Sequence, residues 1–312
     1  WLFAGNPSPK RDGLSRGEGG STRPLPPFLR RVRLSGRRRA VPGLIAEPEP
    51  GAHPGLQITG DRPFENLLFR RGDARGSQRV SRQQELRWAV QKRILADYER
   101  DFSKHIAPRE AERVFAVWDS VVAHLSQENK KFIFGRLAKG ARAKEFESAL
   151  TWLRQAGLIY QVPRVSKPGI PLKAYRDPRA FKVFLLDVGL LGAMSELDSK
   201  SIIEGNTLFE EFKGALTEQY ACQELIASCG LVPYYWSAEN SRGEVDFLVQ
   251  SAGAVYAIEV KAEENLRAKS LRSFKESHPK IKSVRFSLSR YREQDWMRNV
   301  PLYAMSNMGL WG

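Results

Sequence analysis

Two short apolar runs near the C-terminus, separated by a small turn, constrain the fold of this chain more than any other feature. Between Gly243 and Lys261, Val, Phe, Leu, Ile and Tyr recur at alternating positions, which predicts two neighbouring strands. Each run also carries charge, with Asp246 in the first strand and Glu259 and Lys261 at the end of the second. Because alternate side chains share a face, these three are expected to project together from the face opposite the apolar one.

The elements around these strands predict a small α/β domain over residues 201–312. We expect a helix at 206–228, strands at 232–236, 244–249 and 255–261, a helix at 267–277 and a strand at 282–288. The order α-β-β-β-α-β predicts a mixed sheet. On the first helix Glu218 shares a stripe with Ala221 and Leu225, so this acid is expected to point towards the sheet.

Three carboxylates and one ammonium group would then converge, which suits metal-dependent chemistry on a phosphodiester. Oxygen ligands hold Mg²⁺ or Mn²⁺, and the metal stabilises charge on the phosphate and lowers the pKa of an attacking water. The spacing Asp-x12-Glu-x-Lys across a hairpin resembles that of the PD-(D/E)xK nucleases, which have a restriction-endonuclease-like fold. By that pattern Asp246 and Glu259 are the expected metal ligands, Glu218 an auxiliary acid, and Lys261 the residue that orients the water.

Residues 101–200 predict a winged helix-turn-helix domain. One helical stripe contains six apolar positions: Val114, Val117, Trp118, Val121, Val122 and Leu125. Helices are also expected at 129–140 and at 141–157, the latter ending at Gly157. Strands follow at 158–167 and 182–187, and a connector at 188–200. Three helices followed by a two-stranded ribbon outline a winged helix, with 141–157 as the recognition helix.

Positive charge gathers in the middle of the chain, and DNA is the expected partner. The formal net charge is +15, and residues 130–182 hold thirteen basic against three acidic side chains. The expected nucleic-acid contacts are Lys139, Arg142, Lys144, Arg154, Arg164 and Lys167. Such contacts give affinity for phosphates with little sequence reading. A winged helix is equally able to serve as a packing module between domains.

Composition separates the rest of the chain into two further segments. Residues 1–62 hold nine of the 18 prolines and ten of the 25 glycines without any helical or strand period, which predicts a disordered tail. Residues 63–100 are expected to be a helical remnant or a linker. Cys222 and Cys229 form no disulfide framework and suit a reducing cytoplasm. No apolar run is long enough to span a membrane, so no membrane partner is expected.

Several colinear stretches between Arg100 and Phe274 resemble the prokaryotic AAA+-type ATPases that end in a domain of unknown function 4143. They include "NKKFIFGRLAKGARAKEFESALTWLRQAGLI", "FKVFLLDVGLLGA", "GALTEQYACQEL" and "AIEVKAEENLRAKSLRSF". The resemblance implies an ATPase module, then a winged helix, then a domain similar to PD-(D/E)xK nucleases. An ATPase of this kind needs a Gly-Lys pair followed by Ser or Thr, which this sequence lacks. The chain therefore resembles the C-terminal part of such a protein, and no ATP binding is expected.

Two functions follow from these features. The first is DNA binding with Mg²⁺- or Mn²⁺-dependent cleavage. The alternative is a catalytically silent module that recognises another protein or a second copy, or that regulates the ATPase. A Glu-x-Lys pair on a strand is often an exposed ion pair of little energetic weight. The nuclease-like fold is also widely reused without cleavage.

Overall fold

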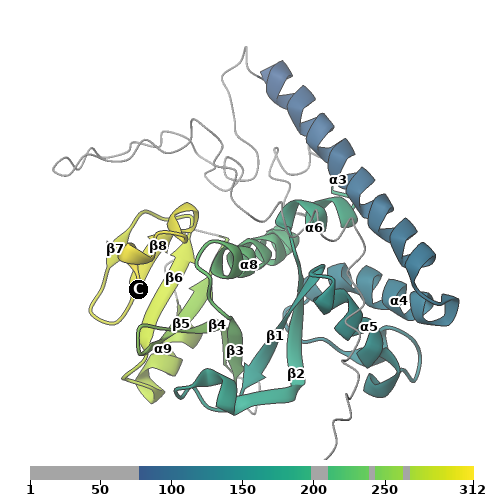
Figure 1. The fold of residues 1–312 in the computed structure, drawn as a ribbon. Helices are drawn as coiled ribbons and strands as arrows, with labels where there is room; N and C mark the ends of the chain where they lie inside the picture. The colour runs from purple at the N-terminus through teal and green to yellow at the C-terminus, as the bar shows by residue number, and fades with distance from the viewer. Residues whose placement is uncertain (1–76, 198–209, 239–242, 263–267) are drawn as a thin grey trace, which may run out of the picture. The chain divides into compact units, whose positions relative to one another are not determined.

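Among the described residues of the computed structural model, eight strands form one sheet in the order β2-β1-β3-β4-β5-β6-β8-β7 (Figure 1). The structure describes residues 77–197, 210–238, 243–262 and 268–312, which all belong to one compact unit, Arg39–Gly312. The tail predicted for residues 1–62 lies outside them. No helix in these described ranges is long and apolar enough to cross a membrane.

Three α-helices precede the sheet and pack through aromatic rings. They are α3 (Ser77–His105), α4 (Pro108–Leu125) and α5 (Ala143–Gln155). Five of the six apolar positions predicted on α4 are buried, and Val122 is half-buried. Phe102 of α3 meets Trp118 of α4 and Trp152 of α5 edge to face, with ring centroids 5.6 and 5.4 Å away. Such edge-to-face contacts stabilise aromatic clusters beyond the area they bury, so this ring links all three helices.

The prediction of a short helix between α4 and α5 is wrong. One 3₁₀ turn, η1 (Phe134–Arg136), occupies part of this stretch, and Lys131 forms an isolated β-bridge with Lys182. Phe132 stacks on the ring of Phe181 with centroids 5.4 Å apart. The segment therefore buries its apolar side chain by lying extended along the sheet edge, which a local helical pattern does not reveal.

The predicted ribbon is present and longer than expected. β1 (Ile159–Val165) and β2 (Arg176–Leu185) are antiparallel and are joined through η2 (Leu172–Tyr175). β2 begins well before the predicted strand at 182–187. On the edge away from β2, β1 pairs in parallel with β3 through Arg164 and Tyr235. The ribbon thus extends the sheet of the C-terminal part.

The segment after β2 was predicted to be a connector, and this is wrong for its first half. Val188–Met194 form helix α6. The Asp187 side chain accepts a hydrogen bond from the Leu190 N–H at 3.0 Å, which satisfies one of the free donors at the helix start. A carboxylate at the N-cap is the local signal that the sequence contained.

The C-terminal part has the predicted α-β-β-β-α-β order. Its elements are α8 (Glu210–Ala227), β3 (Tyr234–Ser237), β4 (Glu244–Ser251), β5 (Ala254–Val260), α9 (Lys269–Ser277) and β6 (Lys282–Ser287). β3, β4 and β5 are antiparallel, and β5 and β6 are parallel, so the sheet is mixed as predicted. β7 (Arg292–Glu293) and β8 (Arg298–Pro301) were not predicted.

The two helices of this part serve different sets of sheet side chains. α9 contributes Leu271 and Phe274 to a buried cluster that includes Leu248 and Ala257. α8 contacts β2 and β5. Figure 1 shows α8 lying beside the strands, with α6 at its end and α3 beyond. Each carboxylate predicted for the site must therefore lie either among the sheet side chains that contact α8 or among those that contact α9.

We predict that Gly157→Ala destabilises the protein by roughly 1–2 kcal/mol, because Gly157 ends α5 with a φ of +75°, a left-handed conformation that is costly with a Cβ. Gly135→Ala is the matched control, since a Cβ there also meets open space but the backbone is outside the left-handed region. The measurement is urea unfolding of both variants. Equal stability of the two variants would contradict the role given to Gly157.

Candidate functional site

The four predicted site residues come from α8, β4 and the end of β5. Glu218 lies in the middle of α8, Asp246 near the start of β4, Glu259 near the end of β5, and Lys261 directly after that strand. Glu218 and Glu259 are buried, each 7% exposed, whereas the Lys261 side chain is 44% exposed. The expectation that Glu218 points from its helix to the sheet is confirmed by its contact with Lys182 of β2.

Asp246 lies at a bulge in β4. Trp236 pairs with Val245 and Tyr234 pairs with Leu248, so β4 uses one more residue here than its neighbour β3. Val245 and Leu248 both pack in the cluster beside α9. The regular alternation predicted for this strand is therefore interrupted between them, at Asp246 and its neighbour.

Glu218 is held by two lysines that come from the N-terminal half of the described chain. Its Oε1 lies 2.6 Å from Lys130 Nζ, and its Oε2 lies 3.8 Å from Lys182 Nζ. Lys182, only 1% exposed, also forms an ion pair with Glu244 of β4. Asp246 lies in the field of Glu218 and Lys182. We call Glu218, Glu244, Asp246, Lys130 and Lys182 the carboxylate–lysine cluster.

The charges of this cluster depend on one another. Burial opposes ionisation of Glu218, but Lys130 and Lys182 outweigh it and hold the pKa of Glu218 below its usual value. Burial also opposes the charge of Lys182, and Glu218, Glu244 and Asp246 outweigh it, so the pKa of Lys182 is raised. Ionised partners thus keep each other charged inside the protein.

Asp246 is the exception in the cluster. Burial, and next the charge of Glu218, raise its pKa from 3.8 to about 7, against the attraction of Lys182 and Lys261. Its Oδ2 accepts a hydrogen bond from the Val260 N–H at 2.8 Å, which also favours the ionised form. Asp246 therefore changes charge near neutral pH.

Glu259 and Lys261 form a second pair beside the cluster. Lys261 Nζ lies 3.5 Å from Glu259 Oε1. In the regular register of β5 and β6, Glu259 aligns with Arg285, whose Nε donates to Asn299 Oδ1 at 2.8 Å. Burial raises the pKa of Glu259, although Lys261 and Arg285 oppose this. Its buried Oε2 accepts no hydrogen bond from the residues that the structure describes.

This arrangement does not fit a metal ion shared by Asp246 and Glu259. The alternation of β5 puts Glu259 on the face of Ala257, which packs beside α9, whereas Asp246 lies in the field of Glu218 and Lys182 and shares only Lys261 with Glu259. In the described ranges, no three His, Cys, Asp or Glu side chains are placed to hold a metal ion. We therefore derive no step through Mg²⁺ or Mn²⁺ at this site.

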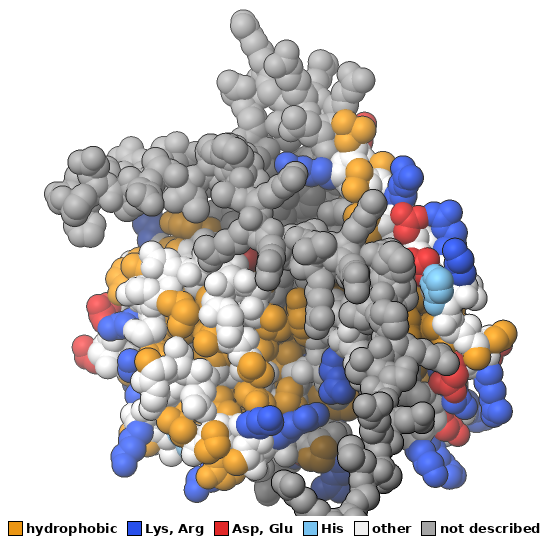
Figure 2. Space-filling model, in the orientation of Figure 1, with side chains coloured by type: hydrophobic (Ala, Val, Ile, Leu, Met, Phe, Trp, Pro, Cys, Tyr) orange, Lys and Arg blue, Asp and Glu red, His pale blue; other side chains and the backbone are white. Residues whose placement is uncertain are grey.

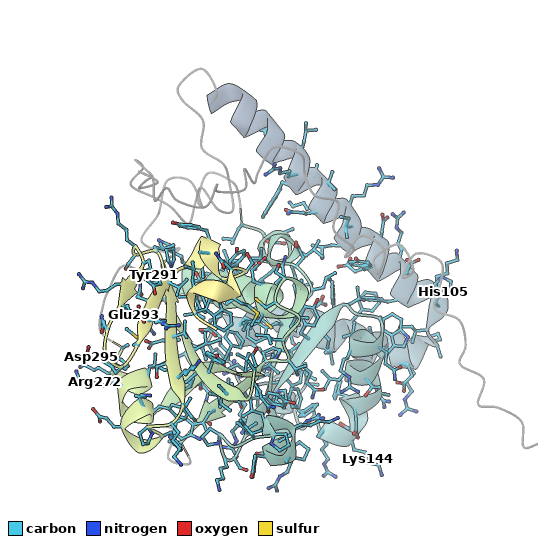
Figure 3. The ribbon with its side chains drawn as sticks, turned by 60° about the vertical axis from the view of Figure 1, so that its left-hand side comes forward. His105, Lys144, Arg272, Tyr291, Glu293 and Asp295 are labelled. Atoms are coloured by element: carbon cyan, nitrogen blue, oxygen red, sulfur yellow. The ribbon has the colours of Figure 1, made fainter. Side chains whose placement is uncertain are left out.

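The predicted nucleic-acid contacts lie apart from the cluster, and five of the six are exposed. The exposed side chains are Lys139, Arg142, Lys144, Arg154 and Lys167. Figure 3 shows Lys144 at the periphery of the helical part, and in Figure 2 Lys and Arg side chains stand at the surface over the helices, with some acids between them. Arg164 differs, because it is half-buried and its Nη2 lies 2.7 Å from Asp177 Oδ2.

Sequence reasoning missed the residues that complete the cluster. Lys182 was treated as part of an apolar strand, and Lys130 as part of a helix that is absent. A lysine within a fully apolar strand was the available signal, because a buried lysine needs a carboxylate partner. The identity of that partner depends on the packing of β2 against α8, which no local pattern contains.

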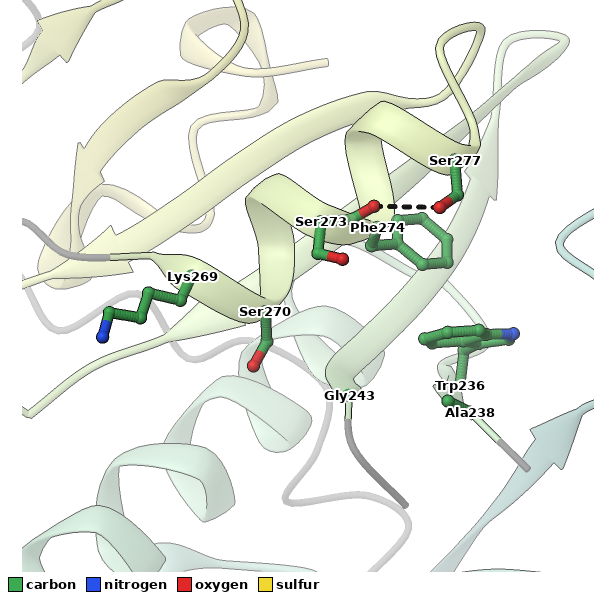
Figure 4. A pocket seen from close by; sticks show the side chains of 8 residues that line it. All are labelled: Trp236, Ala238, Gly243, Lys269, Ser270, Ser273, Phe274 and Ser277. Atoms are coloured by element: carbon green, nitrogen blue, oxygen red, sulfur yellow. Dashed lines mark hydrogen bonds between the residues drawn. The ribbon is translucent and has the colours of Figure 1, made fainter. Parts of the chain in front are cut away.

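A pocket of about 460 Å³ lies beside α9 (Figure 4). Its lining residues are Trp236, Ala238, Gly243, Lys269, Ser270, Ser273, Phe274 and Ser277. Three serine hydroxyls, one lysine and two aromatic rings give it a mixed polar and apolar lining. None of the predicted site residues lines this pocket.

Comparisons with known proteins match two regions of the chain to domains of unknown function. Residues 68–201 match the family model described as Domain of unknown function (DUF8612), and residues 213–305 match that described as Domain of unknown function (DUF4143). The second match agrees with part of the resemblance seen in the sequence. No curated protein matches the chain significantly.

One solved structure is similar to the chain, the crystal structure of protein VC1899 from Vibrio cholerae. The two are 12% identical, and the TM-score is 0.22. The match covers 65% of this chain and 55% of the other, so the chain spans little more than half of that protein. A similarity at this level supports no inference about fold or activity.

We predict that Asp246→Asn flattens the pH dependence of stability between about pH 4 and 7. Because the pKa of Asp246 rises from 3.8 to about 7 on folding, the folded state binds the proton more tightly, and stability falls as pH rises through this window. Asparagine has no group that titrates in this range, so the contribution of this position to the pH dependence is lost. The measurement is the melting temperature as a function of pH.

The matched control for this prediction is Asp295→Asn, the same chemical change at an exposed position (Figure 3). It is expected to leave the slope of melting temperature against pH as in the parent. A slope in Asp246→Asn equal to that of the parent would contradict the raised pKa.

Proposed function

We propose that this chain is a DNA-binding module in which a winged helix contacts phosphates and a nuclease-like α/β part does not cleave. The observation that carries the proposal is the set of exposed cations around α5 and the β1–β2 ribbon. Counterion release by such side chains supplies affinity for a duplex without base reading. The resemblance to AAA+-type ATPases makes an ATPase of that kind the expected context, acting with this chain while the chain itself binds no ATP.

The order of elements supports a winged helix, with α3 in place of the helix predicted at 129–140, which is absent. α3, α4 and α5 are followed by an antiparallel ribbon, and Lys131 adds a bridge to the outer strand of that ribbon. In such domains the last helix enters the major groove and the ribbon touches the backbone. α5 presents Lys144 and Arg154 to solvent, and Lys167 follows β1. These positions suit phosphate contacts on both sides of one groove.

A second candidate, metal-dependent cleavage, is favoured by one observation. Asp246, Glu259 and Glu218 all act on Lys261, whose pKa they raise against the effect of burial. The motif residues therefore share one lysine, as a nuclease site requires. We rank cleavage second because ammonium groups already neutralise Glu218, and because Asp246 and Glu259 do not converge on a common ligand position.

We predict that the double variant Lys144→Ala/Arg154→Ala binds a short DNA duplex more weakly than the parent. The plot of log affinity against log salt is expected to become less steep by roughly 2, because each phosphate that is no longer neutralised removes about 0.9 from its slope. Fluorescence anisotropy at several salt concentrations measures both quantities. Lys280→Ala/Arg292→Ala removes the same charge from exposed positions of the α/β part and is the matched control. Equal weakening in both double variants would refute a specific DNA-binding face.

We predict that the full chain shows no nicking of supercoiled plasmid with Mg²⁺ or Mn²⁺ beyond that of Asp246→Ala and Lys261→Ala prepared identically. The reason is that the carboxylates lack a shared ligand position. Cutting by the parent that disappears in both variants, at unchanged melting temperature, would establish the nuclease and reject the silent assignment.

A further inference from the structure

Lys182 occupies the place in the carboxylate–lysine cluster that an inorganic cation would take. Its Nζ is almost fully buried, forms an ion pair with Glu244 and lies 3.8 Å from Glu218 Oε2. That Oε2 is buried and accepts no hydrogen bond from any described residue. Lys130 Nζ approaches the other oxygen of Glu218 at 2.6 Å. Glu218, Glu244 and Asp246 thus all act on Lys182, and Glu218 is shared with Lys130.

The acids and the lysines of the cluster come from different regions of the chain. Lys130 and Lys182 fall within the region that matches the first family model, residues 68–201. The carboxylates fall within the region that matches the second, residues 213–305. Lys130 directly precedes Lys131, which forms a β-bridge with Lys182 of β2, so the two lysines of the cluster lie near each other along the sheet edge. The helix-and-ribbon part therefore supplies two of the positive charges that act on Glu218, and Lys261 of the α/β part adds a third.

We propose that Lys130 and Lys182 act as a built-in cation that blocks a latent divalent-cation site at Glu218 and Glu244, so that the helix-and-ribbon part inhibits metal binding by the α/β part. This inference rests on the proposed absence of cleavage and gives its physical cause. The latent site differs from the predicted Asp246–Glu259 pair, because it uses the acids that contact Lys182.

The chemistry of the two carboxylates suits such a site. Mg²⁺ is commonly held by one or two carboxylates together with waters, and Mn²⁺ also prefers oxygen ligands. An ammonium ion and a divalent cation compete for the same oxygens. Removing one ammonium leaves buried negative charge uncompensated, which is strongly unfavourable. A divalent cation then restores neutrality, and its binding stabilises the folded state.

The test uses full-length Lys182→Ala, which deletes the ammonium group and its stem, and compares its binding of Mn²⁺ alone with that of the parent. Electron paramagnetic resonance measures free Mn²⁺, and melting temperature is recorded with and without the ion. We expect no binding by the parent. We expect the variant to melt lower than the parent, to bind Mn²⁺, and to gain roughly 2 °C or more when the ion is added.

A second variant keeps the proposal testable if Lys182→Ala does not fold. Lys130→Ala removes the less buried lysine, whose side chain is 12% exposed, and is expected to gain weaker Mn²⁺ binding. Lys282→Ala, which removes a lysine bonded to the Tyr256 hydroxyl instead, is the control and is expected to bind none. Glu218→Gln added to the binding variant is expected to abolish binding.

Each outcome separates this inference from the proposed function. Folded Lys182→Ala or Lys130→Ala protein that binds no more Mn²⁺ than the parent overturns the built-in cation, whatever the result with DNA or plasmid. Mn²⁺ binding that survives Glu218→Gln also overturns it. Plasmid cleavage by the parent overturns the proposed function instead, and this is measured without any lysine variant.

Discussion

The buried attraction between Lys182 and the carboxylates of Glu218 and Glu244 is the interaction on which the rest of the structure depends. Lys182 and Glu218 are costly to bury alone, and each favours the ionised form of the other. Their positions require β2, α8 and β4 to be packed together at once. Partial separation of these elements would leave an unpaired ion in the interior. The ionic cluster therefore favours a structure in which all three elements stay packed together.

The bulge in β4 decides what this centre is able to do. It interrupts the alternation of the strand at Asp246, while β5 and β6 stay in regular register through Glu259. The acids of one sequence motif are thereby divided between the cluster beside α8 and the pair with Lys261. The same motif in a strand without a bulge would bring them to one face. The sequence therefore has the spacing of a nuclease motif, but the extra residue in β4 keeps its two acids from sharing one face of the sheet.

Local patterns predicted much of the fold and little of the candidate site. The stripe on α4, the Gly157 stop and the α-β-β-β-α-β order follow from periodicity and backbone preference, which neighbouring residues encode. The extended segment at Lys131 and the ribbon's junction with β3 arise from pairing between distant residues. The partners of Glu218 are 88 residues away at Lys130 and in another strand at Lys182, so no spacing rule was able to identify them.

The two ends of the sheet have a consequence for self-association. β2 forms one edge, and its outer half carries Arg176, Pro178 and Arg179 at exposed positions. β7 forms the other edge with only Arg292 and Glu293. Short, charged or proline-bearing edge strands resist pairing with a strand of another molecule. Continuous sheets formed by pairing these two edges between copies are thereby disfavoured.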